Sequence, residues 1–173
     1  MIQFIRSLIK SLSSKTNNPL VELNIPLTHF DNDKSSEDFC IDILKKGIAD
    51  KDAGIIQEVL FVQSKQNYKS NELSALLSSI LSLNWHYSHE DIAMMLKDCL
   101  NSDTVNDLYN SAELKFDYLN YDDTFQFSRK CIKALSAIAD TSSIENLWKL
   151  SKSENEVISA YAKKELRYKH LLT

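Results

Sequence analysis

The sequence predicts an all-α fold built from about nine short helices. Apolar residues recur at helical spacing along almost the whole 173-residue chain, so each helix would bury one apolar stripe. Only two glycines and two prolines are present, so few residues easily adopt the positive φ that tight β-turns require. Hydrophobic residues make up 43% of the chain, which is enough for a core. These observations exclude hairpin-rich folds and glycine-rich phosphate-binding loops.

Residues 1–35 are predicted to form an N-terminal helix and an extended arm that pack on the rest of the chain. Apolar residues of the segment 2–12 repeat at helical spacing, and two basic residues interrupt them, which argues against a signal peptide. The segment 20–27 contains an apolar–polar alternation that is compatible with a short strand or an extended arm. The role of residues 16–34 stays open.

Residues 36–173 are predicted to form one domain of stacked helix pairs. Eight apolar stripes follow one another with short connections, as antiparallel helix pairs do. Capping boxes mark several boundaries, because a Ser or Thr followed three residues later by an acid satisfies two backbone amides. The stripes lie at 40–44, 55–60, 73–81, 92–100, 105–112, 128–139, 144–148 and 157–166; the boxes are Ser35–Asp38, Ser88–Asp91, Ser142–Glu145 and Ser153–Glu156, with Asn71 and Asp103 as further N-caps.

One stretch near the C-terminus has the pattern of a known repeat unit. Its residues in order are Arg129, Cys131, Ala134, Leu135, Ile138, Asp140, Ile144 and Leu147. This order resembles a HEAT-repeat unit, and looser copies are visible from Leu77 and from Ile158. Ala139 stands where such units usually carry Gly. The resemblance implies a HEAT-like helical repeat, an α-solenoid, for the domain.

Charge is distributed unevenly along the chain. The net charge is −4, but residues 85–125 hold nine acids and two bases, whereas residues 126–173 carry a net +4. The segment 116–123 combines three acids with three aromatic residues between two predicted helices. Such a loop suits protein recognition, since rings contribute buried area and carboxylates attract a basic partner. The predicted partner-binding residues are Asp117, Tyr118, Tyr121, Asp122 and Asp123, followed by His86, Glu90 and Asp91.

No catalytic or metal site stands out in the sequence. The segment 85–91 places two histidines beside two carboxylates, but their spacing differs from the His-Glu-x-x-His motif and no third ligand lies nearby. A Gly-x-Ser-x-Gly elbow is missing. Cys40, Cys99 and Cys131 are isolated, and we expect reduced, buried thiols. We therefore expect a cytoplasmic protein that is not an enzyme and uses no metal and no cofactor.

Four motifs in the second half of the chain carry a more specific resemblance. They are Trp85-His86-x-x-His89-Glu90-Asp91-Ile92, Thr104-Val105-x-Asp107-Leu108-Tyr109, Tyr118-Leu119-x-Tyr121-Asp122-Asp123 and Arg129-Lys130-Cys131-Ile132-x-Ala134-Leu135. This succession resembles small bacterial HEAT-like immunity proteins, which are encoded beside polymorphic toxins, including those of contact-dependent growth inhibition. The resemblance covers roughly residues 70–168. It implies a protein that binds and neutralises a cognate toxin domain with a basic surface, such as a nuclease.

A second class of function stays open, because basic residues gather in the last third of the chain. A helical-repeat protein with a basic face could bind nucleic acid, or act as a DNA-repair glycosylase that recognises a damaged base. Solvated helix faces explain many such residues equally well. Under the immunity hypothesis we expect neither a nucleic-acid partner nor a membrane partner, since no run reaches the roughly 18 apolar residues of a membrane span. The basic residues are Arg129, Lys130, Lys133, Lys149, Lys152, Lys163, Lys164, Arg167 and Lys169.

Overall fold

The computed structural model describes residues 36–119, 121 and 123–172. Two compact units make up the chain, residues 1–39 and residues 40–173. The second unit contains the helices from α3 to α9 and all the predicted partner-binding residues.

Several expectations fall outside the described residues. They include the predicted N-terminal helix, the arm at 20–27, the capping box that begins at Ser35, and the predicted contact Asp122. The domain boundary predicted at residue 35 stays a prediction as well.

The described residues contain eight α-helices and two 3-10 helices, and no strand. Each of the eight predicted stripes falls mainly within one α-helix, so the all-helical prediction is confirmed for this part of the chain. The predicted ends are less accurate, because α4 ends at Ser79, before the last stripe residue Leu81. The helices are α2 (Ser36–Asp50), α3 (Ala53–Gln66), α4 (Asn71–Ser79), α5 (His89–Cys99), η2 (Ser102–Thr104), α6 (Val105–Ser111), η3 (Asp117–Leu119), α7 (Gln126–Ile138), α8 (Thr141–Leu150) and α9 (Glu156–Tyr168).

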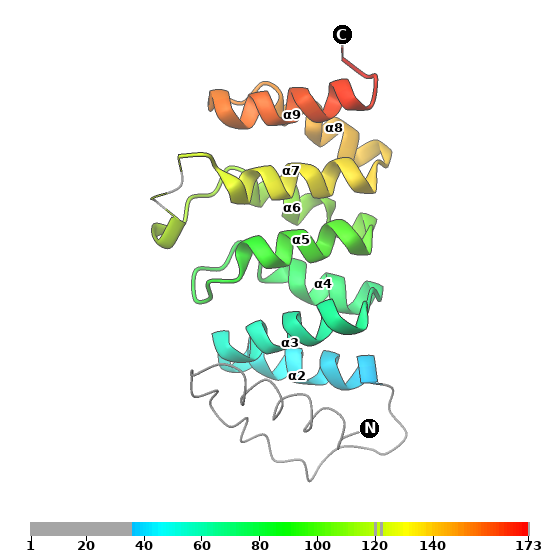
Figure 1. The fold of residues 1–173 in the computed structure, drawn as a ribbon, viewed down its shortest axis with the longest axis vertical. Helices are drawn as coiled ribbons and strands as arrows, with labels where there is room; N and C mark the ends of the chain where they lie inside the picture. Colours follow the sequence, from blue (N-terminus) through cyan, green and yellow to red (C-terminus); the bar gives the residue numbers. More distant parts are fainter. Residues whose placement is uncertain (1–35, 120, 122, 173) are drawn as a thin grey trace. The chain divides into compact units, whose positions relative to one another are not determined.

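Within residues 40–173 the helices lie in two layers (Figure 1). Helices α3, α5, α7 and α9 follow one another in one layer, where α5 packs against α7 and α7 against α9. Helices α4, α6 and α8 form the other layer, and each packs against the odd-numbered helix that follows it. Because the chain alternates between layers, α5 and α7 begin at the same edge. We call this the loop edge, formed by residues 80–88, 112–119, 121 and 123–125.

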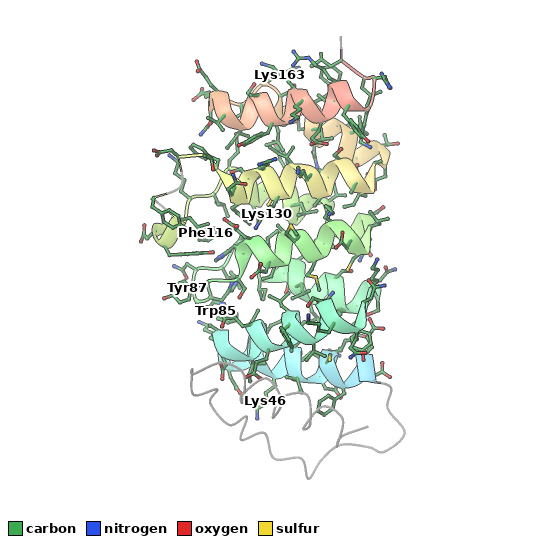
Figure 2. The ribbon with its side chains drawn as sticks, in the orientation of Figure 1. Lys46, Trp85, Tyr87, Phe116, Lys130 and Lys163 are labelled. Carbon is green, nitrogen blue, oxygen red and sulfur yellow. The ribbon has the colours of Figure 1, made fainter. Side chains whose placement is uncertain are left out.

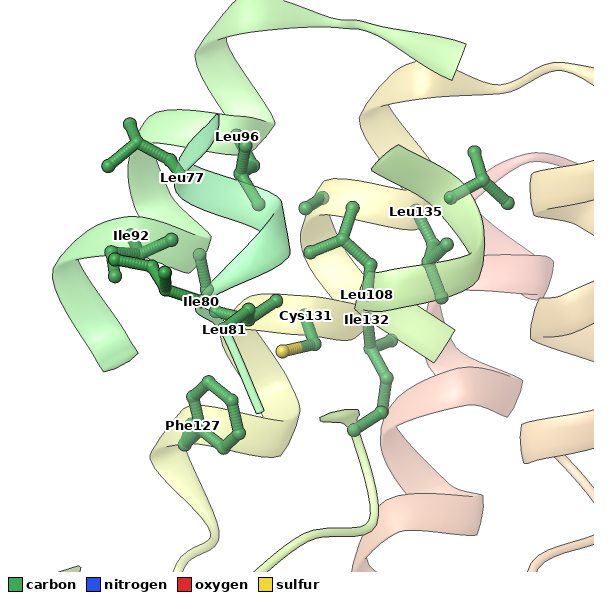
Figure 3. Close-up of a cluster of buried hydrophobic side chains, with 14 of the residues drawn as sticks. Leu77, Ile80, Leu81, Ile92, Leu96, Leu108, Phe127, Cys131, Ile132 and Leu135 are labelled. Carbon is green, nitrogen blue, oxygen red and sulfur yellow. The ribbon is translucent and has the colours of Figure 1, made fainter. Parts of the chain in front are cut away.

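The hydrophobic core lies between the two layers. Figure 3 shows part of it, where leucines and isoleucines of α4, α5, α6 and α7 meet around Cys131. Burying one such side chain stabilises the fold by roughly 1.5–3 kcal/mol. A glycine brings α2 close to α3, since a Cβ on Gly47 would lie 2.5 Å from Cγ2 of Ile55. The fully buried members labelled in Figure 3 include Leu77, Leu81, Ile92, Leu96, Leu108, Ile132 and Leu135.

Most of the observed N-caps lie one or two residues away from the predicted ones. The predicted and the observed residue both have side chains that can accept a hydrogen bond from a backbone N–H. The residue directly before the first turn of the helix is the one that does so. Ser88 does occupy the predicted N-cap position of α5, yet its side chain makes no capping hydrogen bond. The observed N-caps are Ser70 in place of Asn71, Asp140 in place of Ser142 and Asn155 in place of Ser153. Instead of Asp103, α6 has Thr104 at its N-cap with no side-chain bond, and Asn101 caps the preceding η2.

Helix α7 ends in a left-handed residue that is not glycine. Ala139 has a φ of 58°, and its N–H donates to the carbonyl of Leu135. A Cβ in this region costs roughly 1–2 kcal/mol, which explains why the repeat units that this stretch resembles favour Gly here.

We expect Ala139→Gly to raise the free energy of unfolding by about 0.5–1 kcal/mol, because it removes this clash while adding some chain entropy to the unfolded state. Urea unfolding measures the change. The matched control is Ala137→Gly, an exposed position inside the same helix, which should lose about 1 kcal/mol. Loss of stability in both variants would contradict the strain at Ala139.

Candidate functional site

Two buried histidines connect the loop edge to the core. His86 and His89 are both 0% exposed, and their rings stack with centroids 4.2 Å apart. The backbone N–H of Ser88 donates to Nδ1 of His86 over 3.2 Å, so Nε2 carries the proton and donates to the carbonyl of Ile80 over 2.8 Å. His86 therefore ties the end of α4 to the start of α5. This corrects its prediction as a partner contact, because its side chain lies in the core.

His89 joins three segments of the chain. Its Nε2 lies 2.8 Å from the carbonyl of Leu83 and its Nδ1 lies 2.7 Å from the hydroxyl of Tyr118. A carbonyl only accepts, so Nε2–H donates to Leu83 and the hydroxyl of Tyr118 donates to Nδ1. The ring also stacks on Phe116, with centroids 3.6 Å apart, and meets Phe127 of α7 edge-on. These contacts place loop 80–88, η3 and α7 around one side chain.

Both histidines are neutral at physiological pH. Burial and, to a smaller extent, the neighbouring His86 together lower the pKa of His89 to about 4, against the opposing effect of the Leu83 carbonyl. Burial likewise lowers the pKa of His86. Burial also raises the pKa of Tyr118 to about 12, which keeps its hydroxyl protonated as a donor. The hydrogen bonds and the charge states therefore agree with one another.

Tyr118 connects these buried side chains to the surface. Its ring meets that of Tyr87 edge-on, with centroids 5.2 Å apart, and Tyr87 is 64% exposed. Figure 2 shows Trp85, Tyr87 and Phe116 together at the loop edge. Phe116, part of the predicted surface cluster, is buried instead, because it stacks on His89. The aromatic residues of the two loops thus form a continuous path from core to solvent.

Exposed carboxylates and a second exposed tyrosine belong to the same edge of the molecule. Tyr121 is 82% exposed, and Asp91, Asp117 and Asp123 are exposed as well. Asp91 in the first turn of α5 and Tyr121 both raise the pKa of Tyr118, so both lie near its ring. We call these five residues the acidic surface; they are Tyr87, Asp91, Asp117, Tyr121 and Asp123.

Glu90 has a different role from its acidic neighbours. Its carboxylate pairs with the ammonium of Lys130 on α7, and both side chains are mostly covered, at 29% and 24% exposure. The pair links α5 to α7 inside one layer. An ion pair at a partly exposed site is worth roughly 1 kcal/mol or less, so it aligns the two helices more than it stabilises them. Glu90, predicted as a contact, already has this intramolecular partner.

A small pocket lies beside the acidic surface, between η3 and the start of α7. It has a volume of about 120 Å³, and sequence reasoning did not predict it. Phe125 forms one wall in a left-handed conformation, with φ 52° and ψ 49°, directly before α7. The sequence feature that could have indicated this pocket is the pair of phenylalanines, Phe125 and Phe127, at the start of a predicted helix. The lining residues are Leu114, Lys115, Phe116, Leu119, Asp123, Phe125, Phe127 and Ser128.

The basic residues of the last third divide into engaged and exposed side chains. The guanidinium of Arg129 lies 5.7 Å from the ring centroid of Tyr161, which links α7 to α9. Lys130 is held by Glu90. Lys133 on α7 and Lys163 and Lys164 on α9 are exposed. Figure 2 shows Lys130 and Lys163 on these two neighbouring helices of one layer.

The described residues offer no group of three or more His, Cys, Asp or Glu side chains that could hold a metal ion. Cys131 is fully buried, and burial raises the pKa of its thiol, which opposes nucleophilic reactivity. Cys40 is buried as expected, but Cys99 is only half-buried. Of the helices in the described part of the chain, none combines the length and the apolar character needed to cross a membrane.

Comparison with known proteins found no matching family model, curated protein or solved structure. A functional proposal for this chain therefore depends on its own residues and their arrangement.

We expect stability to fall in acid because of His89. Its pKa is about 4 in the folded state, against 6.5 for the ordinary side chain, so the unfolded state binds the proton first. The contribution is complete above pH 6.5 and is lost as the pH falls towards 4, by roughly 3 kcal/mol in total. Urea unfolding between pH 7 and pH 4.5 measures it.

The variant His89→Gln should flatten this pH dependence while lowering stability at pH 7. The matched control His170→Gln replaces an exposed histidine and should keep the slope of the unmodified protein. An unchanged slope in His89→Gln would show that other groups, among them the carboxylates, produce the acid sensitivity.

Proposed function

We propose that this protein is a non-catalytic immunity protein that binds and neutralises a cognate toxin domain through the acidic surface. One observation carries the proposal: exposed Tyr87 and Tyr121 lie among exposed carboxylates, in two loops that share a buried aromatic and histidine core. The resemblance to HEAT-like immunity proteins supplies the partner class. The alternating two-layer arrangement of the helices is compatible with HEAT-like repeats.

The residue types of the acidic surface suit protein binding. Tyrosine is enriched among the residues that dominate interface energies, because its ring buries a large area at low entropic cost. Carboxylates beside the rings attract a basic partner and speed the encounter at low salt. A nuclease toxin has a basic surface that grips phosphates, so carboxylates here would imitate that charge.

Two rings at the loop edge, those of Tyr118 and Tyr87, have supporting contacts before binding. Tyr118 is anchored through His89 to the backbone of Leu83, and its ring supports Tyr87. Ordering mobile side chains is a major cost of association, so a surface with supported rings binds more tightly than a loose one. This supports a tight complex, which neutralisation of a toxin requires.

A second candidate function is nucleic-acid binding through exposed lysines of α7 and α9. The observation that favours it is the group of Lys133, Lys163 and Lys164 on neighbouring helices of one layer. Against it, Arg129 and Lys130 are engaged within the protein, and the chain has a net charge of −4. A mobility shift with duplex DNA at moderate salt separates the candidates, since the immunity role predicts no shift.

The test of the proposed function is coexpression with the product of the neighbouring gene. Copurification together with rescue of growth would support the immunity role. We expect the double reversal Asp117→Lys/Asp123→Lys to weaken binding by several kcal/mol if the carboxylates meet buried cations, measured by titration calorimetry. Its unfolding free energy should stay within about 1 kcal/mol of the unmodified protein, since both residues are exposed.

The matched control for the reversal is Asp98→Lys/Glu145→Lys, two exposed acids at the end of α5 and on α8. It changes the net charge equally and should leave binding nearly unchanged. Equal losses in both doubles would indicate a general charge effect. Collapse of stability in the first double would show that its residues are structural.

Two equally exposed tyrosines provide a further prediction. Tyr121 and Tyr168 are both 82% exposed, but only Tyr121 belongs to the acidic surface, while Tyr168 ends α9. We expect Tyr121→Ala to cost at least about 1–2 kcal/mol of binding free energy, as interface tyrosines do, and Tyr168→Ala to cost almost none. The dissociation rates of the two complexes measure the difference. The reverse order would move the interface to the C-terminal helix.

A further inference from the structure

We infer that the pocket between η3 and α7 receives one apolar side chain of the partner, flanked in the partner's chain by Lys or Arg. The inference rests on the proposed function, since it names the chemistry that the same edge recognises. The pocket adjoins the acidic surface, because Asp123 belongs to its lining and Asp117 begins η3. One partner segment can therefore contact both.

The lining combines apolar side chains with polar atoms, which suits an apolar side chain that has charged neighbours. Five of its residues are large and apolar: Leu114, Phe116, Leu119, Phe125 and Phe127. The volume of about 120 Å³ is close to that of an apolar cavity of roughly 150 Å³ that accepts benzene. A single leucine, methionine or phenylalanine side chain matches that size, whereas a helix or a nucleotide does not.

The walls of the pocket are fixed. Phe116 and Phe127 are 8% and 3% exposed, their rings pack at 5.5 Å, and both contact His89. The opposite wall, Phe125, keeps a positive φ that is unusual for a bulky residue. Such strain is typical of positions where a side chain is held for a function.

The charge around the opening of the pocket favours basic residues next to the apolar residue in the partner's chain. Asp123 in the lining and the adjacent Asp117 are exposed carboxylates, which attract cations. Lys115 also lines the pocket, but its ammonium lies 5.6 Å from the ring centroid of Phe125, in a cation–π contact. Two carboxylates against this one ammonium leave the opening with a net negative charge, and basic residues on either side of the anchor complement it.

Short peptides test the inference without the partner. The probes are the capped tripeptides Lys-Leu-Lys, Lys-Ala-Lys and Glu-Leu-Glu, titrated into the full chain while methyl NMR signals of Leu114 and Leu119 are followed. We expect saturable shifts with Lys-Leu-Lys at millimolar concentration, since few atoms are buried. The other two should bind at least about threefold more weakly, because one lacks the anchor and the other the charges. No saturable shift, or equal shifts with Lys-Ala-Lys, would overturn the inference.

A filled pocket provides the matching variant. Leu119→Trp places a larger side chain in the lining and should abolish the shifts, whereas Leu100→Trp changes an exposed leucine at the other end of α5 and should retain them. If Leu119→Trp unfolds, Leu114→Trp replaces it, since Leu114 is 39% exposed in the same lining. Retained shifts in a folded, filled variant would overturn the inference.

The two proposals fail in different ways. In a purified complex with the partner, Leu119→Trp should lower affinity at least about tenfold. Tight binding by this variant, with rescue of growth, would overturn the pocket and leave the immunity role standing. The opposite outcome is peptide binding confined to the pocket, with no copurifying partner and no rescue of growth. It would support recognition of an apolar side chain by the pocket and would exclude a toxin as the source of that side chain.

Discussion

The loop edge of this protein depends on one buried ring, that of His89. Its two nitrogens bond the carbonyl of Leu83 and the hydroxyl of Tyr118, and its face stacks on Phe116. Both nitrogens of the ring therefore have a partner, which burial demands because an unpaired buried group costs about 1–3 kcal/mol. An apolar side chain here would leave both a carbonyl and a hydroxyl unsatisfied, so the conformations of two loops rest on this residue.

The proposed binding features follow from that constraint. Tyr118, fixed by His89, supports the exposed Tyr87, while Phe116 and Phe127 form the floor of the pocket. The acidic surface and the pocket are thus two parts of one supported edge. A partner that meets preformed rings and a preformed pocket loses less conformational entropy than it would against mobile loops.

Exposed charges of opposite sign occupy two regions of the layer formed by α3, α5, α7 and α9. Exposed carboxylates gather at the loop edge, whereas exposed lysines lie on α7 and α9. The ion pair between Glu90 and Lys130 lies where α5 meets α7, at the junction of the two regions. Such a separation orients an approaching charged partner, because the field differs in sign from one part of the layer to the next.

The sequence by itself determined the helices and the position of the exposed acids, because periodic apolar stripes and local charge depend on neighbours in the chain. It did not distinguish Asp140 from Ser142 as a cap, since both side chains can accept amides and only the backbone conformation selects one. Tertiary structure also decided that His86 and Phe116 are buried and that Phe125 walls a pocket. Those outcomes depend on contacts between residues far apart in the chain, such as His89 and Tyr118, which are 29 positions apart. No local sequence pattern encodes a contact over that separation.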